Sequence, residues 1–336
     1  MDVADLIDAA RAPLSRGDTE TLFHAIFRGE LNEEQIVAYL SATADRKPMV
    51  EELVGAVTAM RAHMRAVAAP PGAIDLCGTG GDGLGTLNIS TAVSFVVAAA
   101  GVIVAKHGNR SATSRSGAAD TLEVLGVKVG LEPAHAERVL ADTGIVFLFA
   151  QYHHPAMKHV GAARKAVGRR TIFNLLGPLA NPARVKRQLI GVFSADWLEP
   201  YAQALAALGS ECAFIVHGKD GLDEVSISEA TQVAALAHGA VNKLEITPEQ
   251  AGLPRHRLGD IVGGDAAHNA AALTALLEGK AANSAYRDIV LLNAAAALMA
   301  AGAVPDIRSG VARAAQALDS GGARAKLKAL IEASNA

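Results

Sequence analysis

The sequence DLCGTGGDGLGTLNIST, residues 75–91, contains five glycines between an apolar run and a segment that ends in Asn-Ile-Ser-Thr. Glycine is used where the backbone needs a positive φ or must approach a ligand closely. An apolar run before the glycines and a polar helix start after them are typical of a strand, a loop and a helix. The stretch therefore predicts a ligand-binding loop between a buried strand and a helix.

Short apolar runs alternate with helical patterns on both sides of this stretch. The expected buried strands are residues 74–77, 102–105, 145–150, 189–193 and 213–216. The expected helices between them include residues 89–100, 119–125 and 198–208. Alternation of this kind predicts an α/β fold with a mostly parallel sheet covered by helices.

The start of the chain shows helical patterns only. Asp18 is expected to cap a helix that ends at Gly29, and Asn32 is expected to cap the next one. Pro48 lies at a plausible first helical position before a third apolar-periodic segment. The sequence therefore begins with a group of helices and no strand.

The segment AAPPGA, residues 68–73, separates these helices from the α/β pattern, because two prolines and a glycine end any helix. We expect a small N-terminal helical domain over residues 1–70 and a larger α/β domain over residues 71–336. A segment near residues 160–180 is expected to join the helical domain.

Composition limits the possible functions. The 336 residues carry a net charge of −3, which gives no basic face for nucleic acid. No apolar stretch approaches the roughly 20 residues of a membrane span, and the aspartate-rich start does not resemble a signal peptide. Cys77 and Cys212 lack metal-site spacing, so we expect free thiols in a reducing cytoplasm.

Two familiar phosphate loops do not fit the glycine stretch. Residues 78–83 match G-x-G-x-x-G, but a dinucleotide loop requires an acidic residue about 20 positions further on, at the end of the second strand. Lys106 and His107 stand there instead. A Walker loop requires a lysine before a serine or threonine, whereas Thr86 directly follows Gly85.

A second polar segment, AKHGNRSATSRSG at residues 105–117, is expected to follow the second strand. Parallel strands end at one sheet edge, so both loops are expected to lie there together. Lys106, Arg110 and Arg115, with several hydroxyl groups, could contact more than one phosphate. Two such loops after successive strands favour a phosphate site over an ordinary polar surface.

Acidic residues follow the last of the expected parallel strands. The segment GKDGLDEVSISEAT places Asp220, Asp223 and Glu224 there. Adjacent carboxylates suit Mg²⁺, which prefers oxygen ligands and bridges substrate phosphates. An isolated Asp-Glu pair is more often a solvated turn, so the prediction of a metal site depends on the neighbouring phosphate loops.

Taken together, these motifs make the chain resemble the anthranilate phosphoribosyltransferase family over essentially its whole length. The resemblance is carried by GTGGD at residues 78–82, NIST at 88–91, KHGNR at 106–110, RRTIFNLLGPLANPA at 169–183 and the pair Asp223-Glu224. It implies a nucleoside phosphorylase/phosphoribosyltransferase-like fold with the active site between the two domains, a homodimer joined through the helical domains and a cytoplasmic location.

The family's activity is a pentosyl transfer in tryptophan biosynthesis. The resemblance implies that the chain moves the 5-phosphoribosyl group from 5-phosphoribosyl 1-diphosphate to the amine of anthranilate. Mg²⁺, at two ions per active site, would be held by Ser90, Asp223 and Glu224. Anthranilate would be faced by Gly78, Asn109 and Arg164, and His107 is expected to line its pocket.

The resemblance also implies the residues that contact the phosphoribosyl donor. These are Gly78, Gly81, Asp82, Gly83, Thr86, Asn88, Ile89, Ser90, Thr91, Lys106, His107, Gly108, Asn109, Arg110, Ser111, Ala112, Thr113, Ser114 and Ala118. Ala118 is a departure, because many family members have a serine there that adds a phosphate contact. No residue is assigned as a catalytic acid or base.

Three alternatives remain. A pyrimidine nucleoside phosphorylase has similar phosphate loops, but Asn109-Arg110 and the segment NLLGPLANP argue against it. A non-enzymatic, nucleic-acid-binding relative would need a basic surface and eroded loops. A metal site made of His153, His154 and His159 is the least favoured.

Overall fold

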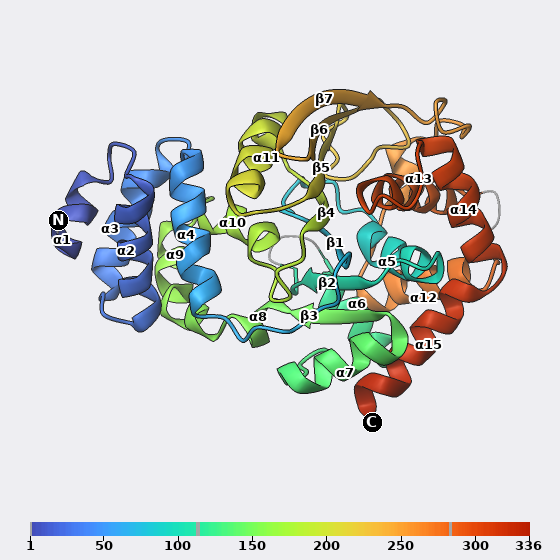
Figure 1. Cartoon of the computed structure of the whole chain (residues 1–336), viewed down its shortest axis with the longest axis horizontal. Coiled ribbons are helices and arrows are strands. Elements are labelled where there is room, and N and C mark those ends of the chain that lie inside the picture. The colour runs from blue at the N-terminus through green and yellow to red at the C-terminus, as the bar shows by residue number, and fades with distance from the viewer. Residues whose placement is uncertain (1, 112–114, 282–283) are drawn as a thin grey trace.

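The computed structural model describes residues 2–111, 115–281 and 284–336. A bundle of helices lies at one end of the molecule, and a twisted sheet covered by further helices forms the rest (Figure 1). The bundle helices are α1 (Val3–Ala9), α2 (Arg16–Arg28), α3 (Glu33–Ala44) and α4 (Val50–Ala62).

A seven-stranded sheet forms the centre of the larger part, in the order β3-β2-β1-β4-β5-β6-β7. Its strands are β1 (Ile74–Gly78), β2 (Val104–Gly108), β3 (Ile145–Phe149), β4 (Arg187–Gly191), β5 (Cys212–Gly218), β6 (Thr231–Ala237) and β7 (Ala240–Ile246). The first five strands pair in parallel, and β6 and β7 add an antiparallel edge. The expected mostly parallel α/β fold is therefore confirmed, whereas β6 and β7 were not expected.

Helices cover both faces of this sheet. The longer ones are α5 (Ile89–Ala99), α6 (Ala118–Val124), α7 (Pro133–Thr143), α11 (Leu198–Ala207), α12 (Ala266–Leu277), α13 (Ala285–Ala300), α14 (Ile307–Asp319) and α15 (Gly322–Asn335). Shorter turns are α8 (Ala150–His153), η1 (Pro155–His159), α9 (Gly161–Val167), α10 (Phe173–Leu176), η2 (Gly177–Ala180), η3 (Ala195–Trp197) and η4 (Leu258–Ile261). Along the described ranges, no helix is both long and apolar enough to cross a membrane.

Alternating side chains divide the apolar interior into two clusters. In β4, Leu189 packs into the cluster under α5 and α13, whereas Ile190 packs into the cluster shared with the bundle. In β5, Phe214 and Ile215 divide in the same way. This follows from the two-residue period of a strand, which points successive side chains to opposite faces. The bundle therefore shares one continuous core with a face of the sheet.

The chain returns to the bundle after β3. Helix α9 packs against α3, η1 packs against α2, and α10 packs against α4. Figure 1 shows α9 beside the blue bundle helices although it is distant from them in sequence. The expected domain boundary near residue 70 stays a prediction.

Two expected helix starts are wrong by a few residues. Ser15 rather than Asp18 caps α2, because the Ser15 hydroxyl accepts a hydrogen bond from the Asp18 amide at 3.1 Å. Helix α4 begins at Val50 after Met49, so Pro48 lies outside the helix. The cap at Asn32 and the left-handed end of α2 at Gly29 are confirmed.

A buried carboxylate, paired with a half-buried arginine, holds parts of the bundle together. Glu52 is 1% exposed, and its carboxylate accepts hydrogen bonds from the amides of Leu14 at 3.2 Å and Met49 at 2.9 Å. The same carboxylate receives the Arg46 guanidinium at 2.7 Å. One side chain therefore ties the loop before α2, the turn before α4 and the start of α4 together.

Replacing Glu52 with alanine is expected to lower the free energy of unfolding by about 1–3 kcal/mol, because two amides and a half-buried guanidinium lose their acceptor. Chemical denaturation measures this change. Glu51, the exposed neighbour on α4, is the matched control, and Glu51→Ala is expected to shift stability by about 0.5 kcal/mol or less. Equal losses in the two variants would contradict this role for Glu52.

Candidate active site

The glycine loop joins the end of β1 to the start of α5. Gly80, Gly81, Gly83 and Gly85 all have positive φ angles, between 62° and 83°. At Gly80, Gly83 and Gly85 an added Cβ would meet open space, so backbone conformation rather than crowding requires glycine there. The loop leaves its backbone accessible, as a loop that binds phosphate through its amides requires.

A segment distant in sequence holds the second half of this loop. The Leu87 amide donates to the Ile261 carbonyl at 2.9 Å, and the Gly263 amide donates to the Gly85 carbonyl at 2.8 Å. Thr86 and Val262 form an antiparallel bridge between these two contacts. Sequence reasoning missed this contact between residues 261–263 and the glycine loop, although the glycine pair after Val262 was a signal of close backbone approach.

The side chain of Asn88 links the start of α5 to neighbouring helices. Asn88 makes no capping bond; its Oδ1 accepts from Thr121 Oγ1 at 2.6 Å and from Asn269 Nδ2 at 2.9 Å. Its side chain therefore connects α5 with α6 and α12. Ile89 and Thr91 are almost fully buried, at 2% and 1% exposure, which leaves the backbone as their means of contact with a ligand.

Lys106 and His107 lie within β2 rather than in a loop after it. The strand continues to Gly108 because its parallel pairing with β3 extends that far, with Lys106 opposite Phe147. The expected strand end near residue 105 is therefore wrong. Both side chains become nearly buried, at 4% exposure.

Lys106 forms a buried link beneath the glycine loop. Its Nζ donates to the Leu76 carbonyl and to Ser90 Oγ, the latter at 3.1 Å. Burial lowers the pKa of Lys106, while the carboxylates of Asp75 and Glu224 oppose that shift. The amine therefore orients Ser90 and places positive charge under the acidic side chains.

His107 is held in one orientation. Its amide donates to Asp75 Oδ1 at 2.9 Å, its Nδ1 lies 3.1 Å from the Gly177 carbonyl, and its ring packs 5.2 Å from that of His154. Burial, followed by the neighbouring His154, holds the pKa of His107 well below its usual value. A neutral imidazole with Nδ1–H bonded to the carbonyl leaves Nε2 as an acceptor.

The second polar loop contributes fewer free cations than expected. Arg110 forms ion pairs with Asp120 at 2.8 Å and with Glu123 at 2.7 Å. Its positive charge is therefore already neutralised by these carboxylates before any ligand binds. Asn109 is exposed at the loop start, and Ala118 begins α6 just after the loop. Ala112, Thr113 and Ser114 lie outside the described residues.

Asp223 and Glu224 reach the glycine loop from the turn after β5. Asp223 Oδ2 accepts from the Gly80 amide at 3.0 Å, and Glu224 Oε1 accepts from the Ser90 amide at 3.1 Å. The close approach requires Gly191 beneath them, because a Cβ there would lie 1.5 Å from the Asp223 carbonyl oxygen. The acidic pair therefore contacts the loop that the sequence predicts to bind phosphate.

The electrostatics of this acidic pair are unfavourable without a cation. Burial and the neighbouring Asp82 raise the pKa of Asp223 to about 7, and burial and Asp223 raise the pKa of Glu224 to about 8. These causes penalise the charged forms, which a divalent cation would stabilise. Asp223 at the Gly80 amide and Glu224 at the Ser90 amide supply the hard oxygen donors that suit Mg²⁺.

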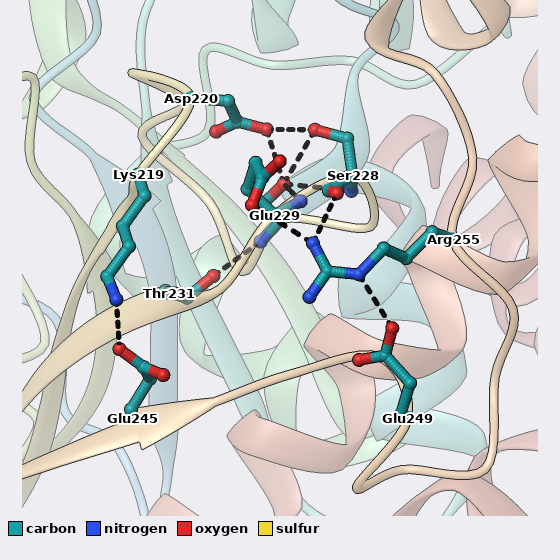
Figure 2. A network of polar contacts seen from close by, with 9 residues as sticks. Lys219, Asp220, Ser228, Glu229, Thr231, Glu245, Glu249 and Arg255 are labelled. Atoms are coloured by element: carbon teal, nitrogen blue, oxygen red, sulfur yellow. Dashed lines mark hydrogen bonds and ion pairs between the residues drawn. The ribbon is translucent and has the colours of Figure 1, made fainter.

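Asp220, the third acid of that turn, points elsewhere. Its Oδ2 accepts from the hydroxyls of Ser226 and Ser228, so its charge is used to shape the turn (Figure 2). Among the described residues, no group of three or more His, Cys, Asp or Glu side chains could hold a metal ion. The alternative site at His153, His154 and His159 is therefore wrong.

Two arginines lie on the segment that returns to the bundle, and one of them, Arg170, contacts the glycine loop. Arg164, on α9, is half-buried with its guanidinium carbon 5.7 Å from the ring centre of Phe173, and burial lowers its pKa. Arg170 lies 3.9 Å over the Phe193 ring and donates to the Gly81 carbonyl. Sequence reasoning named Arg164 but gave Arg170 no individual role, although the motif at residues 169–183 contains it.

Comparison with known proteins agrees with this two-part architecture. A family model described as "Glycosyl transferase family, a/b domain" matches residues 70–324, and one described as "Glycosyl transferase family, helical bundle domain" matches residues 5–64. The fold and the site therefore define a glycosyl transferase built from a helical bundle and an α/β domain.

Similar proteins narrow this class. The anthranilate phosphoribosyltransferase of Rhodopseudomonas palustris (strain BisB18) is 56% identical over 328 residues, covering 98% of this chain and 96% of its own. The solved enzyme of that name from Thermus thermophilus superposes with a TM-score of 0.94 at 38% identity, covering 100% of both chains. The one from Saccharomyces cerevisiae in complex with PRPP and Mg gives a TM-score of 0.90 at 29% identity, covering 99% and 98%. The chain belongs to the anthranilate phosphoribosyltransferase family.

The unfavourable burial of the Asp223 carboxylate can be tested by measuring the stability of the protein. In metal-free protein, a carboxylate whose pKa is raised on folding costs stability increasingly as the pH rises from the unfolded pKa through the folded value of about 7. Asp223→Asn removes that charge and keeps an oxygen for the Gly80 amide. We expect its unfolding temperature at pH 8, in the presence of a chelator, to exceed that of the parent by a few degrees.

The difference between Asp223→Asn and the parent should shrink toward pH 4, where both side chains are neutral. Thermal unfolding across this pH range measures it. If Asp223→Asn were less stable than the parent at pH 8, the charged form of Asp223 would not destabilise the folded protein, and this prediction would be wrong.

Proposed function

We propose that this chain transfers the 5-phosphoribosyl group from 5-phosphoribosyl 1-diphosphate to the amine of anthranilate in tryptophan biosynthesis. The observation that carries the proposal is the contact of Asp223 and Glu224 with the amides of Gly80 and Ser90. This contact brings an acidic pair for a cation to a loop and a helix start suited to phosphate. A phosphorylated donor that binds together with Mg²⁺ fits both features.

The donor would bind along the glycine loop and the following helix start, with its phosphates also reached by the second polar loop. Ser90, Asp223 and Glu224 would hold Mg²⁺, for which we propose two ions. Bound Mg²⁺ supplies neutralisation of the diphosphate as it leaves. Lys106, whose Nζ lies 3.1 Å from Ser90 Oγ, would hold the Ser90 hydroxyl in place.

The reaction breaks the bond between C1 of the ribose and the diphosphate oxygen, whose electron pair leaves with diphosphate. The amine nitrogen of anthranilate forms the new bond to C1 and afterwards loses a proton. An aryl amine is already unprotonated at neutral pH, so a strong base is not required. The chain's main contribution is to hold the two substrates in line.

Arg164 supplies the charge that anthranilate would recognise. It is half-buried, and no acidic side chain in the described ranges forms an ion pair with it, so its guanidinium could accept a substrate carboxylate. Gly78 and Asn109 would contact the same substrate. His107, neutral and with Nε2 unpartnered among the described residues, would line the pocket.

The homodimer through the helical bundle and the cytoplasmic location stay predictions. The shared apolar core of the bundle and the sheet supports a rigid placement of α9 and Arg164 relative to the donor loops. Gel filtration with light scattering tests the dimer.

The direct test is to mix the purified chain with anthranilate, 5-phosphoribosyl 1-diphosphate and Mg²⁺ and to follow the loss of anthranilate fluorescence. We expect consumption that requires all three additions. Phosphorolysis of a pyrimidine nucleoside, without turnover of anthranilate, would overturn the proposal in favour of the phosphorylase alternative.

Arg164→Ala is expected to raise the KM for anthranilate about tenfold or more, because a charge-assisted contact contributes about 1.5–3 kcal/mol. The KM for the donor should change little. Lys165→Ala, on the exposed side of the same helix, is the matched control and should leave both constants unchanged. An equal loss for both substrates in Arg164→Ala would contradict the assignment.

A further inference from the structure

The acidic pair is carried by an irregular turn, residues 219–230, which we name the acidic turn. It connects β5 to β6 and contains no helix or strand. Its ends are joined by a hydrogen bond from Lys219 N to the Ala230 carbonyl at 2.9 Å, and Gly218 N, at the end of β5, donates to the Leu222 carbonyl at 2.8 Å. An irregular turn needs further contacts if it is to hold two mutually repelling carboxylates in fixed positions.

Asn293, in the middle of α13, makes such a contact. Its Oδ1 accepts from the Val225 amide at 2.8 Å, and its Nδ2 donates to the Val225 carbonyl at 2.8 Å. Nδ2 also donates to the Ile289 carbonyl at 2.9 Å within the helix. One side chain therefore bonds both polar backbone groups of the residue that directly follows Glu224.

The geometry determines the orientation of this amide. Both hydrogens of Nδ2 face carbonyl oxygens, and a flipped amide would place Oδ1 against those oxygens. Asn293 is 0% exposed, so no water replaces a lost partner. The Val225 side chain is also fully buried, which fixes this residue on its second side.

The outer part of the acidic turn is closed by its own side chains. Asp220 accepts from the hydroxyls of Ser226 and Ser228, and the Ser226 amide donates to Thr231 Oγ1 at 2.8 Å. Figure 2 shows Arg255 reaching this region and pairing with Glu229 and Glu249. These contacts shape the turn from outside, whereas Asn293 attaches it to the core beside Glu224.

We propose that Asn293 is a positioning residue for the transfer reaction: it holds the backbone at Val225 so that Glu224 faces Ser90 and Asp223 faces Gly80. This inference rests on the proposed function, because it assigns to Asn293 the placement of the side chains that would hold Mg²⁺. It assigns no contact between Asn293 and substrate.

The expected effect is large for a residue outside the site. Loss of a partner that orients metal ligands typically reduces affinity or activity about 10–100-fold. Without Asn293, the two Val225 backbone groups lose their buried partner, and repulsion between Asp223 and Glu224 is free to separate the carboxylates. Donor binding with Mg²⁺ should therefore weaken. Binding of anthranilate, which involves Arg164 on α9, should not weaken.

The test compares Asn293→Ala with Leu298→Ala, a matched control that also removes buried contacts of α13 (Leu298 is 0% exposed). Thermal unfolding of each variant measures the general loss of stability. Calorimetric titration with 5-phosphoribosyl 1-diphosphate in the presence of Mg²⁺ measures donor binding, and steady-state assays give the KM for each substrate.

We expect Asn293→Ala to raise the donor Kd about tenfold or more and the anthranilate KM less than about threefold. Leu298→Ala should bind the donor as the parent does, even with an equal or larger loss of stability. Should Asn293→Ala fail to fold, Asn293→Asp replaces it, since it keeps the acceptor for the Val225 amide and loses the Nδ2 donor.

Parent-like donor binding in the Asn293 variant would overturn the inference, and so would an equal weakening in Leu298→Ala. Failure of the proposed function is recognised separately, because the parent itself would then neither bind the donor with Mg²⁺ nor consume anthranilate.

Discussion

The site depends on a cluster of negative charge that the fold keeps partly buried. Asp223 and Glu224 contact the glycine loop, which itself carries Asp82, and the mutual repulsion of these acids adds to the cost of burial. Protein interiors accept buried charge only when it is paired, neutralised by protons or bound to a metal. The arrangement is therefore costly by itself, and a bound cation would offset that cost, as the proposed binding of the phosphoribosyl donor together with Mg²⁺ requires.

The sheet makes this placement possible. β1 and β4 are neighbours, so the glycine loop after β1 lies next to Gly191, the last residue of β4. Because Gly191 has no side chain, the backbone of Asp223 can pass directly over it. On the other side of β1, β2 brings Lys106 beneath Ser90. Lys106 of β2 and the acidic pair after β5 therefore meet beside the glycine loop that follows β1.

Sequence reasoning succeeded where local chemistry determined structure. Positive φ angles explain the glycine loop, and adjacent acids after an apolar run indicated the acidic pair. It failed where competing contacts decided the outcome. The extension of β2 to Gly108 comes from pairing with β3, and β7 is an edge strand whose exposed polar residues lack a buried-strand pattern.

Long-range backbone contacts were also hidden from sequence reasoning. Nothing in the local pattern places Ile261 and Gly263 against the glycine loop, or Asn293 against Val225, because each pair is far apart in the chain. Asn293 did leave one signal, since it is a single asparagine in the apolar segment IVLLNAAAALMAAG. A lone buried amide in such a helix needs partners, and those partners lie beside the candidate site.

In the proposed reaction, Asp223 and Glu224 couple donor binding to Mg²⁺. The most direct measurement is the affinity for 5-phosphoribosyl 1-diphosphate at a series of Mg²⁺ concentrations, in the parent and in the double variant Asp223→Asn with Glu224→Gln. We expect Mg²⁺ to strengthen donor binding in the parent, and we expect the double variant to need at least about tenfold more Mg²⁺ for the same affinity. An unshifted Mg²⁺ dependence in the double variant would contradict this expectation.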